Sequence, residues 1–165
     1  MKSMTKLAVA MLAMGCLSLG IPQAQAAATD SIAVTVTLDT IISVSVDVSA
    51  WAIGAKTLSA TALSDLVTAT NDGNVTEKFM IKGANGGGGW ALGAAAGADQ
   101  FSLGFDLTAP YETFVAIDTT GVVLAAPVAR AGAQTFKMQY GMPTSDTKGG
   151  GVGQGFDITV TASVP

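Results

Sequence analysis

IAVTVTLDTIISVSVDV, residues 32–48, is the stretch that decides the fold class. Its large apolar residues fall on even positions, and outside a break at residues 39–41 its odd positions hold small or polar residues. Period-2 alternation of β-branched residues is typical of a half-buried strand, because successive side chains point to opposite faces. The stretch therefore predicts one long bent strand or two strands joined by a kink.

The C-terminal segment FDITVTASV, residues 156–164, shows the same alternation and predicts a closing strand. Shorter strands are expected at residues 66–70, 75–82, 101–107, 111–117, 122–124 and 134–140. Asn71-Asp72-Gly73-Asn74 lies between the first two and predicts a hairpin, because these residue types tolerate the positive φ angles of tight turns. A helical turn is expected at residues 94–99 and a long glycine-rich loop at residues 142–155.

Turn signals at intervals of roughly 8–12 residues favour an antiparallel sandwich over a parallel α/β sheet. We therefore expect an all-β fold, an immunoglobulin-like or jelly-roll antiparallel β-sandwich of about eight or nine strands. No long stretch has helical periodicity, and the chain has no evident internal repeat.

The first residues do not resemble the rest. Two lysines open the chain, an uncharged apolar run follows, and Ala24-Gln25-Ala26 ends it, which is the layout of a secretory signal peptide. We expect cleavage after Ala26 and a single domain over residues 27–165. Cys16 lies within this signal, either as a small apolar residue or, less favourably, as a lipid-attachment cysteine. The protein is thus expected outside the cell or at its surface, with the periplasm as an alternative and no transmembrane segment in the mature chain.

The composition argues against catalysis. The chain has no histidine, and its one cysteine falls in the signal, so the commonest general base and nucleophilic thiolate are missing. A carboxylate-only hydrolase is the remaining enzymatic option. Without the signal lysines, six lysines and arginines face twelve acids, a net charge of −6, which argues against nucleic acid as a partner. Charged residues are only 12% of the chain, and a surface so poor in charge is weakly protected against self-association.

Two groups of residues could bind a ligand: the oxygen-rich residues 71–77 and the two tryptophans. The residues 71–74, with Glu77, offer oxygen ligands for calcium, although a turn explains the same residues without a metal, so no cofactor is expected. Trp51 and Trp90 either bind a partner or belong to the core and its loops, and the second interpretation is favoured.

The segment 32–38 has two interpretations. It is an ordinary edge strand of its own sandwich, which the sequence alone favours, or it fills a groove in the next subunit and places its apolar side chains in waiting pockets. A head-to-tail contact of this kind need not close, so it builds filaments. The side chains that would make the intersubunit contact are Ile32, Val34, Val36 and Leu38.

Several pieces together resemble the small secreted bacterial sandwiches of the TasA/camelysin type, which form biofilm-matrix fibres. They are the signal peptide, the alternating strand after it, TNDGNVTEKFMI at residues 70–81 and FDITVTAS at residues 156–163. The resemblance implies a jelly-roll or immunoglobulin-like sandwich that polymerises by strand donation.

The sequence thus predicts a secreted, non-enzymatic structural subunit of an extracellular fibre, biofilm matrix or surface coat. The alternative is a monomeric adhesive module at the cell surface, which binds a glycan or a protein through the loops at residues 86–90, which include Trp90, and 144–155.

Overall fold

The computed structural model describes residues 31–148 and 153–165. The chain divides into two units, Met1–Thr37 and Leu38–Pro165. In the first unit, the described residues 31–37 are exposed and form no strand. The predicted signal peptide, residues 1–26, and Cys16 lie outside the described residues.

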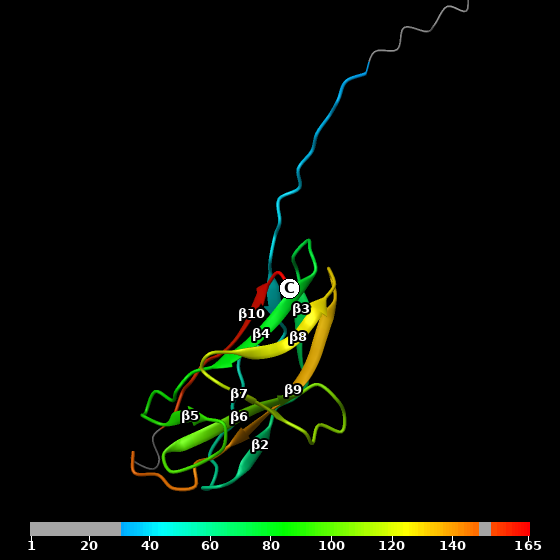
Figure 1. The fold of residues 1–165 in the computed structure, drawn as a ribbon. Helices are drawn as coiled ribbons and strands as arrows, with labels where there is room; N and C mark the ends of the chain where they lie inside the picture. Colours follow the sequence, from blue (N-terminus) through cyan, green and yellow to red (C-terminus); the bar gives the residue numbers. More distant parts are fainter. Residues whose placement is uncertain (1–30, 149–152) are drawn as a thin grey trace, which may run out of the picture. The chain divides into compact units, whose positions relative to one another are not determined.

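The described residues of the second unit are all-β and form ten strands in two sheets (Figure 1). The strands are β1 (Val44–Val46), β2 (Thr61–Leu63), β3 (Val67–Asn71), β4 (Glu77–Gly83), β5 (Ala91–Gly93), β6 (Gln100–Asp106), β7 (Val115–Ile117), β8 (Val122–Val128), β9 (Ala133–Gly141) and β10 (Ile158–Ser163). Residues 31–148 and 153–165 contain no helix that is long and apolar enough to cross a membrane.

The larger sheet has the order β1-β3-β9-β6-β5, with β2 also paired to β9 and β7 to β6. The smaller sheet has the order β10-β4-β8, so that β4 lies between its two neighbours (Figure 1). Seven of the eight strand pairings in the described chain are antiparallel, and β5 pairs with β6 in parallel. Only residues 94–99 separate these two strands, a much shorter connection than parallel neighbours usually need.

Period-2 alternation builds the core. In β4, Phe79 and Ile81 are fully buried, while Met80 and Lys82 between and after them are more exposed. In β9, Phe136, Met138 and Tyr140 are buried in the same way. These side chains join one continuous apolar cluster with Val67, Ala69, Trp90, Phe101, Leu103, Phe105, Ile117, Leu124 and Val128.

The all-β class is confirmed, and residues 31–148 and 153–165 hold ten strands where about eight or nine were expected. The strands predicted near residues 66–70, 75–82, 101–107, 111–117, 122–124, 134–140 and 156–164 are present, and β2 and β5 are additional. The immunoglobulin-like or jelly-roll assignment stays a prediction.

The predicted hairpin at residues 71–74 is wrong, although both of its strands exist. β3 belongs to the larger sheet and β4 to the smaller one, so the chain crosses from one sheet to the other. The Asn71 side-chain amide donates to the backbone oxygens of Val75 and Val128, at 2.8 and 3.1 Å. These bonds tie the connection to β8, and no ladder forms between β3 and β4.

Two other local predictions are wrong. Residues 94–99 form no helical turn, because Gly97 and Ala98 make isolated bridges to Gln100 and Ser145 instead. Residues 32–38 form no strand, and the run at residues 42–48 contributes only the short β1. Alternation makes a segment suitable for a sheet, but a strand exists only where a neighbouring strand supplies hydrogen bonds.

Candidate functional site

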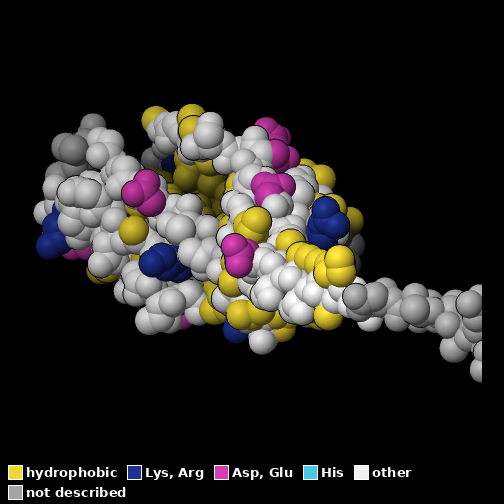
Figure 2. All heavy atoms as spheres, turned by 90° about the horizontal axis from the view of Figure 1, so that it is seen from above, with side chains coloured by type: hydrophobic (Ala, Val, Ile, Leu, Met, Phe, Trp, Pro, Cys, Tyr) yellow, Lys and Arg dark blue, Asp and Glu magenta, His cyan; other side chains and the backbone are white. Residues whose placement is uncertain are grey.

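The most prominent feature of the second unit is an open apolar cleft of about 1320 Å³ next to β10, called here the β10 cleft. The space-filling view shows a hollow with hydrophobic side chains inside it (Figure 2). The lining is contributed by residues 46–58, the core side of β9, the start of β10 and the segment before it, together with Trp90, Met142 and Asp146. The volume exceeds the roughly 300–1,000 Å³ of typical small-molecule sites.

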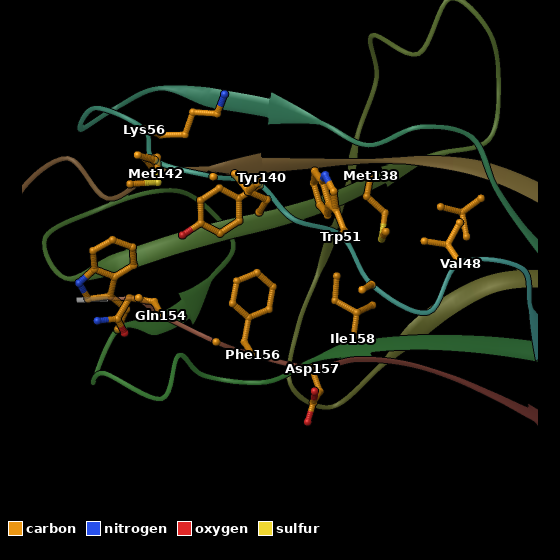
Figure 3. A pocket seen from close by; sticks show the side chains of 18 of the residues that line it. Val48, Trp51, Lys56, Met138, Tyr140, Met142, Gln154, Phe156, Asp157 and Ile158 are labelled. Carbon is orange, nitrogen blue, oxygen red and sulfur yellow. The ribbon is translucent and has the colours of Figure 1, made fainter. Parts of the chain in front are cut away.

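Three chain segments face one another across the cleft. Met138 and Tyr140 from β9 lie on one side, and Phe156 and Ile158 point toward them from the other, whereas Asp157 between them points away (Figure 3). Trp51 lies between these two sides on the segment that follows β1 (Figure 3). This segment, residues 47–60, forms no strand, so the cleft has a wall of irregular chain where a sandwich usually has a paired strand.

Aromatic rings connect the larger sheet to the segment that precedes β10. Phe156 stacks on Phe101 of β6 with ring centroids 4.7 Å apart, and on Tyr140 of β9 with centroids 5.7 Å apart. Phe101 and Tyr140 also stack, at 5.4 Å. Burial raises the pKa of the Tyr140 hydroxyl to about 12, so this group stays neutral at physiological pH. The cluster gives the cleft a rigid, uncharged wall.

Trp90 lines the same cleft but is only 8% exposed. Its indole Nε1 donates to the Asp146 carboxylate at 3.1 Å. Gly86 donates its backbone N–H to the Trp90 carbonyl at 2.8 Å, which folds the glycine-rich loop against this residue. Trp90 therefore anchors the loops at residues 86–89 and 146, as the core-or-loop interpretation expects, and it presents little ring surface to a partner.

Hydrogen bonds between Asp99 and Thr147 fix the loop that contains Asp146. Asp99 accepts hydrogen bonds from the Thr147 backbone N–H at 2.6 Å and from the Thr147 hydroxyl at 2.5 Å. These bonds, together with the charge of Lys148, hold the pKa of Asp99 below its usual value.

Strand β10 borders the cleft, and one of its edges has no strand partner in the described chain. β10 pairs with β4 through six consecutive residue pairs, and no strand of the described chain pairs with its other edge. Ile158 and Val160 line the cleft, while Thr159 and Thr161 are exposed on the opposite face. The strand ITVTAS contains neither a charge nor a proline, the usual guards of an exposed edge.

The four residues predicted to make an intersubunit contact are strongly exposed. The side chains are 91% exposed at Ile32, 78% at Val34, 84% at Val36 and 78% at Leu38. A run of large apolar side chains in water is unusual for a segment with no further role, since burying each one would gain about 1.5–3 kcal/mol. We call residues 32–38 the arm.

The residues just after the arm are fixed by the connection between β3 and β4. Asn74 accepts from the Ile41 backbone N–H at 2.8 Å, returns a backbone bond to the Ile41 carbonyl at 3.0 Å, and donates its side-chain amide to the Asp39 carbonyl at 2.7 Å. Glu77, fully buried, accepts from the Ser43 backbone N–H at 2.9 Å. We call this set of bonds the clasp.

The side-chain oxygens that were considered as calcium ligands accept hydrogen bonds from the backbone instead. Asn71 Oδ1 accepts from the Gly73 N–H at 2.9 Å, and Asn74 Oδ1 and Glu77 Oε1 hold the chain after the arm. In the described part of the chain, no three His, Cys, Asp or Glu side chains lie close enough together to hold a metal ion. In the structure, these residues hold the backbone through hydrogen bonds.

No protein-family model matches the chain, and no curated protein or solved structure is significantly similar to it. The resemblance to TasA/camelysin-type fibre proteins therefore stays a prediction.

The structure adds residues that sequence reasoning did not select. The alternation at residues 156–164 marked Ile158 and Val160 as inward-facing, but it gave no sign that the neighbouring edge would be free. Residues 47–60 carry no strand signal beyond Val48, and this was the available hint of an irregular wall.

Proposed function

We propose that this chain is a secreted structural subunit that self-associates into an extracellular fibre, biofilm matrix or surface coat. The observation that carries the proposal is the arm, whose four large apolar side chains are between 78% and 91% exposed. The arm contains no charged residue and alternates over its whole length. It has the chemistry of a strand whose partner is another chain.

The energetics support a contact of useful strength. Burying four such side chains would gain roughly 6–12 kcal/mol at about 1.5–3 kcal/mol each. Association and ordering of the arm cost several kcal/mol of this gain, which leaves a contact in the range of reversible assembly. Because the arm and its acceptor are different surfaces, each subunit would use both, and the chain of contacts need not close.

The test compares the chain from Ala27 with the chain from Asp39, which lacks the arm. The longer protein is expected to form regular filaments in negative-stain electron microscopy and polydisperse species in sedimentation velocity. The shorter protein is expected to be a monomer with the same circular dichroism spectrum and melting temperature. Monomers from both proteins at every concentration would overturn the proposal.

The β10 cleft favours a second candidate, a monomeric module that binds an apolar or aromatic ligand. The predicted glycan- or protein-binding loop depends on Trp90, and its burial and its bond to Asp146 leave the cleft itself as the better place for a ligand. This candidate predicts a monomer whose tryptophan fluorescence changes on addition of a small apolar probe, because both Trp51 and Trp90 line the cleft. Such a change should occur equally in the chain that lacks the arm.

A further inference from the structure

We infer that the acceptor of the arm is the β10 cleft of a second copy, in which the arm adds a fourth strand to the sheet β10-β4-β8 along the free edge of β10. This inference rests on the proposed function and specifies its contact surface.

The smaller sheet offers two edges, and they differ in quality. β10 is a regular strand, paired residue by residue with β4 from Ile158 to Ser163. β8, at the other edge, pairs with β4 through two register shifts and contains Pro127, which has no backbone N–H. A strand that adds to a sheet needs a continuous row of backbone donors and acceptors, and β10 supplies the better row.

The side chains of the arm match those of β10. A strand placed beside β10 with the same facing puts Ile32, Val34, Val36 and Leu38 on the side of Ile158 and Val160, which line the cleft. Thr35 and Thr37 of the arm then lie on the outer face, where Thr159 and Thr161 are exposed. In this arrangement the apolar side chains of the arm enter the apolar cleft. The threonines of the arm and of β10 are neighbours on the solvent-exposed face, and such cross-strand threonine pairs are favourable.

The lengths agree as well. At about 3.3 Å per residue, the seven residues of the arm extend over roughly 23 Å and the six residues of β10 over roughly 20 Å. The cleft of about 1320 Å³ has room for several aliphatic side chains in addition to Trp51. The charged residues of the lining are Lys56, Asp146 and Asp157, and the side chain of Asp157 points away from the cleft (Figure 3).

The position of the clasp favours a second copy over the same chain. The cleft lining begins at Val46, the last residue of β1, and continues through the segment after it. The clasp holds residues 39–43, on the other side of β1 along the chain. A segment that precedes residue 39 therefore joins β1 at its N-terminal end, whereas the cleft lining continues from the C-terminal end of β1.

The experiment is disulfide mapping in a chain without other thiols. Cys16 is the only cysteine of the full sequence, so protein from Ala27 has none. A Thr35→Cys variant is mixed under mild oxidation with Thr159→Cys, with Thr161→Cys or with Ala126→Cys, a matched exposed position on β8. All four substitutions are at positions that are not buried, and circular dichroism checks that each variant folds.

The expected result is a disulfide-linked dimer with Thr159→Cys or Thr161→Cys, at least tenfold more abundant than with Ala126→Cys. Assemblies that form while the crosslink appears only with Ala126→Cys, or with neither edge, would overturn the β10 acceptor and leave the proposed function standing. Loss of all assembly in the unmodified protein would overturn the proposed function itself. A Thr35→Cys, Thr159→Cys double variant that closes its disulfide within one chain at high dilution would show that the acceptor belongs to the same copy, which also overturns the inference.

Discussion

The arm and strand β10 carry almost the same pattern of residues in different surroundings. Residues 32–38 read IAVTVTL and β10 reads ITVTAS, both with apolar side chains on even positions and no charge. In β10, Ile158 and Val160 are half-buried against the core, and the backbone pairs with β4. In the arm, the corresponding side chains are at least 78% exposed, and no strand forms.

The difference teaches that a neighbour, and not the alternation, makes the strand. β10 has β4 beside it and Phe156 stacked on the large sheet just before it, so its apolar face is covered. The arm has a similar alternating pattern, but it has no neighbouring strand and forms no strand itself. If another copy supplies the neighbour, the two segments should become equivalent on assembly.

The largest expected effect concerns the apolar face of the arm. Val34→Lys with Val36→Lys should abolish assembly, because each lysine would have to bury an unpaired charge at a cost of several kcal/mol. Thr35→Lys with Thr37→Lys adds the same charge to the opposite face and should largely preserve assembly. Sedimentation velocity separates the two variants. An equal loss of assembly in both variants would mean that it does not matter which face of the arm carries the apolar side chains.

The second effect compares a residue beneath β10 with one in the arm. Ile81 is fully buried and pairs directly with Val160, so Ile81→Ala should lower the free energy of unfolding by about 2–5 kcal/mol. Val34→Ala removes an exposed side chain and should change it by less than about 0.5 kcal/mol. Urea unfolding at a concentration where the protein is monomeric measures both. A cost above about 1 kcal/mol for Val34→Ala would contradict the exposed arm.

The third effect tests the clasp that fixes the chain after the arm. Glu77→Ala removes the acceptor of the Ser43 N–H and should cost about 1–3 kcal/mol. Hydrogen exchange at Ser43 should accelerate, while exchange in β10 should change less. Glu77→Gln retains an acceptor oxygen and serves as the matched control. A faster exchange in β10 than at Ser43 would place the role of Glu77 elsewhere.

The smallest effect concerns the loop that carries Asp146 into the cleft wall. The hydrogen bonds from Thr147 lower the pKa of Asp99 in the folded protein. The stabilisation is therefore present above the unfolded pKa of about 3.9 and is lost as the pH falls through the lower folded value. Asp99→Asn should reduce the melting temperature slightly at pH 7, and the difference should shrink below about pH 4. Thr147→Val should behave similarly, and a difference that stays constant from pH 7 to pH 2 would contradict this account.

The sequence by itself determined the all-β class and the inward face of some strands. In β9 and β10 the period-2 pattern gave both the element and its inward face, because alternating side chains have only two faces to choose from, whereas in β4 and β6 it gave the element. The absence of histidine and the low fraction of charged residues limited the kinds of catalytic site that the sequence could be expected to form. The interpretation of Trp90 as a core or loop anchor also came from sequence and agrees with its burial.

Only the tertiary structure decided which strands become neighbours. Asn71-Asp72-Gly73-Asn74 has the residue types of a hairpin turn, yet it joins two sheets, because its amides bond to β8 and to the chain after the arm. The free edge of β10 and the cleft beside it were likewise invisible in the sequence. Local patterns encode the direction of side chains, whereas pairing depends on long-range contacts between residues far apart in the chain. That is why the two similar segments, residues 32–38 and β10, have different environments in one molecule.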